Sequence, residues 1–164
     1  MRIKSIGLAS IGIGTLAVIG LAIVGPTPEE PKPHLNQAGN SHELVVYKSA
    51  TCGCCGIWTT YMKNLGYKVD VVNTEELDTV KEEHQVPQSL NSCHTTIVNS
   101  GQYFIEGHIP EEAISQLLED EPPILGIGMP GMPSASPGMP GKKLAPFDIS
   151  QVSKDGQVSP YMSI

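Results

Sequence analysis

Three cysteines within four residues, at the junction between an apolar segment and a helical one, constrain this chain more than any other feature. Residues 51–56 read Thr-Cys-Gly-Cys-Cys-Gly, so Cys52 and Cys55 have the C-x-x-C spacing of dithiol redox sites and of half a metal site. Cys54 lies between them. Three thiols cannot all pair with one another, so one always stays a thiol or a ligand. The cluster therefore favours binding of a soft metal, with disulfide chemistry as a companion or a competitor.

The segments around this cluster predict alternating strands and helices. Residues 44–47 are continuously apolar, as in a buried strand, and residues 57–65 repeat apolar side chains at helical spacing before Gly66. The elements expected further along are a strand at 69–72, a helix capped by Thr74 with Glu75 and Glu76 in its first turn, a hairpin of residues 95–98 and 102–105, and a helix begun by Pro110. The order β-α-β-α-β-β-α over residues 43–120 predicts an α/β domain of the thioredoxin-like, glutaredoxin-like type that binds metal.

The two ends of the chain differ from this domain. Arg2 and Lys4 precede an uncharged apolar run, so residues 1–25 are predicted to be either a signal sequence or an N-terminal membrane anchor. Residues 26–42 are predicted to be a Pro-rich linker. Residues 121–164 contain Gly-Met-Pro three times and are expected to form an irregular Gly/Met/Pro-rich extension that packs on the domain. An edge strand formed by residues 147–149 and the segment around Val152 is an option.

Charge and leader together define the compartment and exclude some partners. The positive N-terminal flank predicts export, most simply to a bacterial periplasm, with tethering to the inner membrane if the anchor is retained. Of the 10 basic residues, the two at the N-terminus leave 8 against 17 acidic ones, a net charge of −9 for the exported part. Such an acidic domain is a poor partner for nucleic acid or anionic lipid, and membrane contact is expected only through the N-terminal segment.

The candidate metal ligands lie in two loops. A strand-to-helix junction directs backbone N–H groups and the helix dipole at the thiols, which lowers their pKa and favours thiolate. Cys93 and His94 stand immediately before the predicted third strand, where this fold should bring them opposite the C-x-C-C loop. Five soft or borderline ligands exceed the needs of one tetrahedral ion, which allows a polynuclear site. Thiolates select Cu(I) first and zinc second.

Weaker candidates remain open. His108 is either a site residue or a helix-entry residue, and Met129 and Met132 either capture Cu(I) through thioethers or cover apolar surface. The histidines expected to be exposed and without a role are His34, His42 and His84. Two structural disulfides are the ordinary expectation for four exported cysteines. The main alternative to a copper protein is a thiol–disulfide oxidoreductase with Cys52 as nucleophile and Cys55 as resolving thiol.

Four motifs in a fixed order resemble one family. They are residues 47–56 (Tyr-Lys-Ser-Ala-Thr-Cys-Gly-Cys-Cys-Gly), 92–95 (Ser-Cys-His-Thr), 106–110 (Glu-Gly-His-Ile-Pro), and 131–133 with 136–139 (Gly-Met-Pro and Ser-Pro-Gly-Met). The family is the CopG-like group of small exported metal-binding proteins, often encoded with copper-resistance systems. The resemblance spans about residues 44–149. It implies a thioredoxin-like fold, a periplasmic location, and copper held by a C-x-C-C plus Cys-His site, here Cys52, Cys54, Cys55, Cys93 and His94. It also implies a role in copper tolerance with copper redox conversion, and other periplasmic copper-handling proteins as partners.

Overall fold

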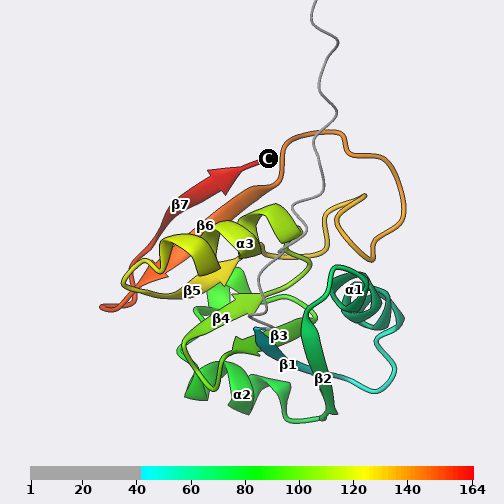
Figure 1. Cartoon of the computed structure of the whole chain (residues 1–164), viewed down its shortest axis with the longest axis horizontal. Coiled ribbons are helices and arrows are strands. Elements are labelled where there is room, and N and C mark those ends of the chain that lie inside the picture. Colours follow the sequence, from blue (N-terminus) through cyan, green and yellow to red (C-terminus); the bar gives the residue numbers. More distant parts are fainter. Residues whose placement is uncertain (1–41) are drawn as a thin grey trace, which may run out of the picture. The chain divides into compact units, whose positions relative to one another are not determined.

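The computed structural model describes residues 42–164 (Figure 1). The predicted signal sequence or anchor, His34, and all of the predicted linker except residue 42 lie outside the described residues. Within residues 42–164, none of the helices combines the length and apolar character needed to cross a bilayer.

The described chain forms a mixed α/β fold around one seven-stranded sheet in the order β2-β1-β3-β4-β5-β6-β7. Its elements are β1 (Glu43–Lys48), α1 (Gly53–Asn64), β2 (Lys68–Asn73), α2 (Leu77–Glu83), the short 3-10 helix η1 (Gln88–Leu90), β3 (His94–Val98), β4 (Tyr103–Glu106), α3 (Glu111–Asp120), β5 (Ile124–Gly128), β6 (Asp148–Ser153) and β7 (Val158–Ser163). β1 pairs parallel to β2, and β4 pairs parallel to β5, whereas the other neighbours are antiparallel.

From β1 to α3 the order of strands and helices is the one predicted, but the start of α2 is a correction. The helix begins at Leu77, not directly after Thr74. The Thr74 hydroxyl accepts a hydrogen bond from the Glu76 N–H at 3.0 Å, which closes a short turn. Because Glu76 has non-helical backbone angles (φ −103°, ψ 44°), both glutamates precede the helix.

The prediction of an irregular extension after residue 120 is wrong for much of its length. Residues 124–128, 148–153 and 158–163 are strands that widen the sheet, and residues 129–147 form the long segment without helix or strand (Figure 1). Ile127 and Val152 are fully buried and Ile149 nearly so, so this region carries its own apolar anchors. The high Gly and Pro content of residues 129–147 hides these short strands in an average over the segment.

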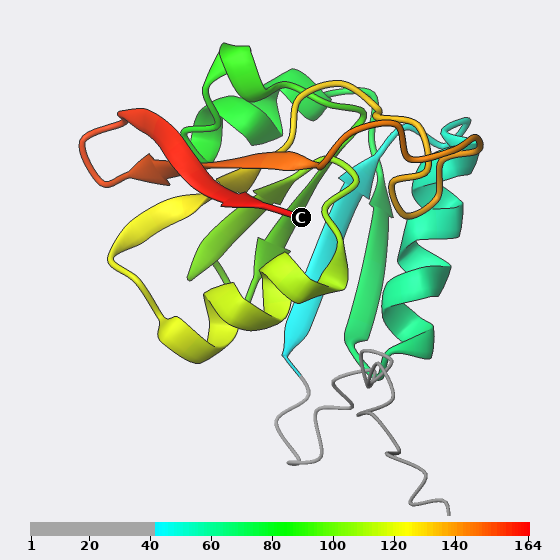
Figure 2. The same ribbon diagram turned by 90° about the horizontal axis from the view of Figure 1, so that it is seen from above.

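Two apolar clusters lie on opposite faces of the sheet. Side chains of α1 and α3 form the larger cluster with alternate sheet residues such as Leu44 and Val46. The smaller cluster joins Val86 and Leu90, which follow α2, to the other face of the sheet. Figure 2 shows the sheet between α2 and the pair α1 and α3.

The register of β1 against β3 positions the candidate site. Lys48, the last residue of β1, is paired with His94, the first residue of β3. The cysteine loop begins where β1 ends, and Cys93 lies where β3 begins, so both are at the same end of the sheet. The antiparallel pairing therefore brings the two ligand-bearing loops together at one end of the sheet.

Gly126 in β5 should be intolerant of any side chain. A Cβ at this position would lie 2.6 Å from Cγ of Phe104 and against the Phe104 carbonyl oxygen, so one methyl group overpacks the β4–β5 contact. We expect Gly126→Ala to lower the free energy of unfolding by about 1–3 kcal/mol, measured by chemical denaturation.

The matched control is Gly56→Ala in α1, where a Cβ meets no atom within 4 Å. That change should leave stability unchanged or raise it by up to about 1 kcal/mol, because alanine favours the helix. Equal effects of the two substitutions would contradict the packing of β5 on β4.

Candidate metal centre

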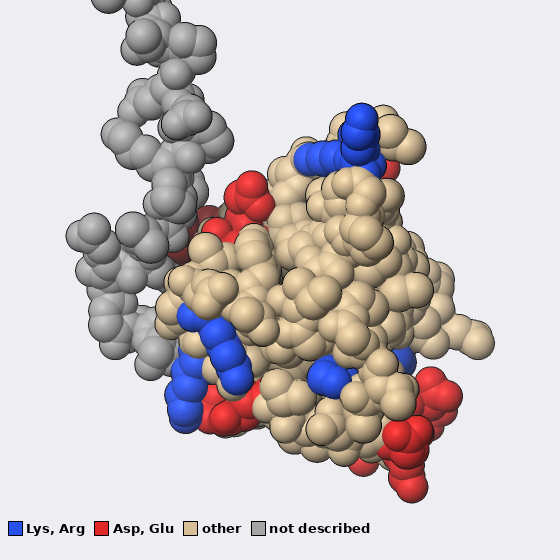
Figure 3. Space-filling model, turned by 90° about the vertical axis from the view of Figure 1, so that its right-hand side faces the viewer, with Lys and Arg blue, Asp and Glu red and all other residues tan. Residues whose placement is uncertain are grey.

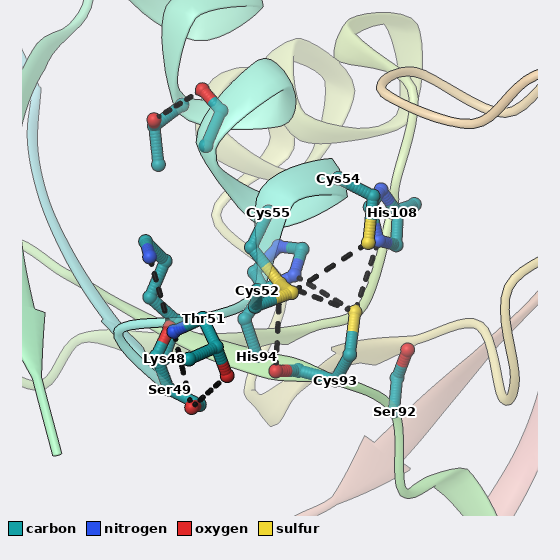
Figure 4. Close-up of a disulfide and its surroundings, with 12 residues drawn as sticks. Lys48, Ser49, Thr51, Cys52, Cys54, Cys55, Ser92, Cys93, His94 and His108 are labelled. Carbon is teal, nitrogen blue, oxygen red and sulfur yellow. Dashed lines mark hydrogen bonds between the residues drawn. A yellow bond between two sulfur atoms is a disulfide. The ribbon is translucent and has the colours of Figure 1, made fainter.

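Six cysteine and histidine side chains converge at this end of the sheet (Figure 4). Cys52 caps α1, and Cys54 and Cys55 lie in its first turn. Cys93 and His94 come from the start of β3, and His108 follows β4. The fold therefore brings Cys93 and His94 opposite the C-x-C-C loop, where the sequence placed them, and adds His108.

The sulfur atoms form one continuous group. Cys52 and Cys55 are joined in a disulfide, and Cys54 and Cys93 are free thiols. Sγ of Cys93 lies 3.4 Å from Sγ of Cys55, and Sγ of Cys54 lies 3.6 Å from Sγ of Cys52. The structure thus has one disulfide among its four cysteines and not two, and each free thiol contacts one of the bonded sulfurs.

His108 is held in a defined tautomer. Its Nδ1 lies 2.7 Å from the Pro137 carbonyl oxygen, which can only accept, so Nδ1 carries the proton. Burial lowers the pKa of His108, while the Pro137 carbonyl raises it, with a net lowering that favours the neutral ring. Nε2 is then a free lone pair, and it faces Sγ of Cys93 at 3.0 Å. A carbonyl that fixes the far nitrogen of a histidine is the usual support of a metal-ligating imidazole.

His94 is fully buried and neutral. Burial, followed by the charges of His108, Lys81 and Lys48, lowers the pKa of His94 well below its usual value. Its ring lies 4.7 Å from the Trp58 ring and 4.9 Å from the His108 ring. Nδ1 is 3.6 Å from Sγ of Cys93, and Nε2 has no hydrogen-bond partner within the described part of the chain. A buried imidazole with unmet bonding capacity suits a metal ligand.

Burial favours the thiol form of Cys93 over the thiolate. Burial, and then the neighbouring Cys54, raise the pKa of Cys93 to about 11. The thiol proton can be donated to Nε2 of His108, which accounts for their close approach. A metal ion that binds Cys93 would displace this proton.

The loop at residues 129–147 closes one side of the site, a feature that the sequence reasoning missed. Gly138 has a positive φ of 87°, and a Cβ there would lie 2.6 Å from the Cys54 carbonyl and 3.2 Å from Nδ1 of His108. Only glycine lets the loop approach this closely. The glycine of the third Gly-Met-Pro is the sequence signal for this close approach.

The other predicted residues lie elsewhere. Met129 is buried in the larger apolar cluster, and Met132 is 50% exposed, so their function as thioether ligands stays a prediction. His42 and His84 are half-buried and not exposed, and Nδ1 of His42 lies 3.0 Å from the Asn99 side-chain nitrogen at the β3–β4 turn.

Figure 3 shows the face that carries α1 and the 129–147 loop, where charged residues lie round the margin and the centre has few.

The candidate ligand atoms form two overlapping groups. In each group the atoms all lie within 4.8 Å of one another. The first group is Cys52, Cys54, Cys55 and Cys93, and the second is Cys55, Cys93, His94 and His108. Cys55 and Cys93 are common to both, so the site as a whole offers six soft or borderline ligands, more than a single tetrahedral ion uses.

The chain is similar to one protein family and to two solved structures. A family model described as "Protein of unknown function, DUF411" matches residues 90–139. Two solved structures entitled "Copper resistance protein copG", Form 2 and Form 1, are 31% and 32% identical to this chain, with TM-scores of 0.69 and 0.68. Form 2 aligns over 75% of this chain and 98% of its own, and Form 1 over 74% and 96%. A search of curated proteins finds no significant match.

The fold and the cysteine–histidine cluster define an α/β protein with a candidate metal centre. At this identity and coverage, the chain belongs to the CopG family.

The buried histidine should make the metal-free protein sensitive to mild acid. An unfolded histidine titrates near pH 6.5, whereas the pKa of folded His94 is lower. Between these two values the unfolded chain binds more protons, so stability falls as the pH drops below about 6.5, by at most about 1.4 kcal/mol per pH unit for this one group.

Chemical denaturation at pH 7.5 and 5.5 checks this expectation. His94→Gln should reduce the acid-induced loss of stability, and the control His84→Gln, in a half-buried position away from the cluster, should keep the parental loss. An unchanged loss in His94→Gln would show that His94 is not held neutral by burial.

Proposed function

We propose that this protein binds Cu(I) through its cysteine–histidine cluster and serves copper resistance or homeostasis. The observation that carries the proposal is the pair of overlapping ligand groups, which share Cys55 and Cys93. Membership of the CopG family supports copper as the ion, because the related structures are entitled copper resistance proteins.

The donor set fits Cu(I) better than zinc. Thiolate sulfur and imidazole nitrogen are soft or borderline ligands, and Cu(I) prefers them. Zinc also accepts such ligands but needs only four of them around one ion, and six ligand residues lie here. We therefore propose Cys52, Cys54, Cys55, Cys93 and His94 as ligands of more than one copper ion, with His108 as a sixth through its free Nε2.

The disulfide links copper binding to redox state. While Cys52 and Cys55 are bonded to each other, two of the six ligands cannot act as thiolates. Two Cu(I) ions carry the two electrons that reduce this disulfide to two thiolates, and they become Cu(II). The reverse reaction restores the disulfide and Cu(I). Copper redox conversion is thus a chemistry that the site allows.

The proposal also includes a thioredoxin-like fold and a periplasmic location. The strand order β2-β1-β3-β4, with the C-x-x-C at the N-terminus of α1, supports a thioredoxin-like core in which Cys93 precedes β3 and His94 begins it. The apolar leader supports export to a bacterial periplasm, with other copper-handling proteins there as donors or acceptors of the ion.

A second function, thiol–disulfide exchange, is favoured by one observation. Sγ of Cys93 contacts Sγ of the Cys52–Cys55 disulfide at 3.4 Å, so a further thiol stands beside the bond that would exchange. Against this function, burial keeps Cys93 protonated near neutral pH, and Cys54 has no part in a two-cysteine redox cycle.

An anaerobic Cu(I) titration of the reduced protein against a competing chelator tests the copper proposal. We expect more than one tightly bound copper per chain. Cys54→Ser and His94→Ala should lower this number or weaken the affinity by about 10-fold or more, because loss of even an outer partner of a metal ligand has an effect of that size. His84→Ala is the matched histidine control and should bind copper as the parent does.

The substitution Cys54→Pro separates the two functions. For a copper protein it should abolish tight copper binding, whereas an oxidoreductase should keep or improve its ability to reduce insulin disulfides. Parental copper binding in the triple variant Cys52→Ser, Cys54→Ser, Cys55→Ser would contradict the copper proposal.

A further inference from the structure

A buried ion pair lies directly behind the cysteine–histidine cluster and takes no part in the ligand set. Lys81 of α2 is 4% exposed and Glu106, the last residue of β4, is fully buried. The Lys81 ammonium donates to Oε1 of Glu106. Both side chains are charged types that rarely occur in a protein interior without a specific partner or role.

The pair holds both residues that flank Cys93 and His94. On one side, the Ser92 N–H donates to Oε1 of Glu106 at 2.6 Å, and the Ser92 carbonyl accepts from the Lys81 ammonium at 3.3 Å. On the other side, the Thr95 hydroxyl donates to Oε2 of Glu106 at 2.6 Å and accepts from Lys81 at 3.1 Å.

These contacts fix where Cys93 and His94 point. Cys93 lies at a bend directly before β3, and this bend lets Cys93 and His94 face the same site. A rotation of the backbone at residues 92–95 would turn Sγ of Cys93 away from Cys55 and His108. Four charge-assisted contacts hold the two ends of this short segment to one rigid anchor between α2 and β4.

Stability alone does not account for this arrangement. Removing two charges from water costs several kcal/mol for each ion, and apolar residues of similar size are often as stabilising as a buried ion pair or more so. An apolar pair, however, offers nothing to the Ser92 N–H or to the Thr95 hydroxyl. What the ion pair adds is a defined conformation of residues 92–95.

We propose that Lys81 and Glu106 are positioning residues that hold the Cys93–His94 segment in the orientation that presents both side chains to the C-x-C-C loop. This inference rests on the proposed function of the cluster as a copper site. The pair does not touch the ion. It acts through the backbone and hydroxyl groups on either side of two ligands, as the outer hydrogen-bonding partners of metal ligands do.

The double variant Lys81→Met, Glu106→Leu separates positioning from stability. It removes both charges together, so neither is left buried without a partner. The Ser92 N–H and the Thr95 hydroxyl lose their partners, which offsets that gain, so the variant should stay folded with a free energy of unfolding at or below that of the parent. Affinity for Cu(I) should nevertheless fall about 10- to 100-fold, the usual effect of losing an outer partner of a metal ligand.

The control is a second lysine–glutamate pair, which lies within the sheet. Lys68 and Glu43 make an exposed ion pair of 2.8 Å between β1 and β2, with the same separation of 25 residues along the chain as Lys81 and Glu106. The variant Lys68→Met, Glu43→Leu should keep the parental affinity for Cu(I).

A second readout needs no metal. In the protein with the Cys52–Cys55 disulfide formed, Cys54 and Cys93 are the two free thiols. Alkylation by iodoacetamide, followed by mass spectrometry, should show a severalfold faster reaction of Cys93 in the Lys81→Met, Glu106→Leu variant, with Cys54 as an unchanged internal reference.

The outcomes keep the two proposals apart. If the parent binds no Cu(I), the proposed function fails, and Cys93 alkylation alone decides on positioning. A stable double variant with parental Cu(I) affinity and parental Cys93 alkylation would overturn the positioning role. If the double variant does not fold, Thr95→Val takes its place, because it removes the contacts on one side only. Parental Cys93 alkylation in Thr95→Val would then overturn the inference.

Discussion

The antiparallel pairing of β1 with β3 is the interaction on which the candidate metal centre depends. It sets Lys48 opposite His94. The cysteine loop follows β1 and Cys93 precedes β3, so both lie at the same end of the sheet. A shift of one residue would turn every side chain of β3 to the opposite face and move His94 away from Trp58. The sheet register therefore assembles ligands that lie about forty residues apart in sequence.

Around this register, two supports bring the side chains to their final positions. The Pro137 carbonyl sets the tautomer of His108, so that Nε2 faces Cys93. The Trp58 ring lies against His94 and donates through its Nε1 to the Ile109 carbonyl at 3.0 Å, which fixes the wall of the site. Each support comes from an element distant in sequence, and together they give a soft, largely dry site that suits Cu(I) better than a hard cation.

The sequence was sufficient to predict the parts of the site that depend on local pattern. The spacing of Cys52, Cys54 and Cys55, and the apolar runs on either side of them, predict the strand, the loop and the helix. Cys93 and His94 were placed correctly because the order of elements fixes which loops meet. The Pro137 carbonyl and the contacts of Lys81 with Ser92 could not be predicted, since both depend on the tertiary path of segments whose composition resembles ordinary loop or helix surface. β6 falls where the sequence offered an optional strand around residues 147–149 and Val152, although it is not at the edge of the sheet. β5 and β7 were missed because short apolar segments are diluted by the Gly and Pro between them.

The most direct test of the copper site is X-ray absorption at the copper K edge of the reduced protein loaded with Cu(I). The account predicts sulfur as the main scatterer around copper, with an imidazole contribution that disappears when His94 and His108 are both replaced by alanine. A coordination shell of oxygen and nitrogen alone, without sulfur, would contradict a site built on Cys55 and Cys93.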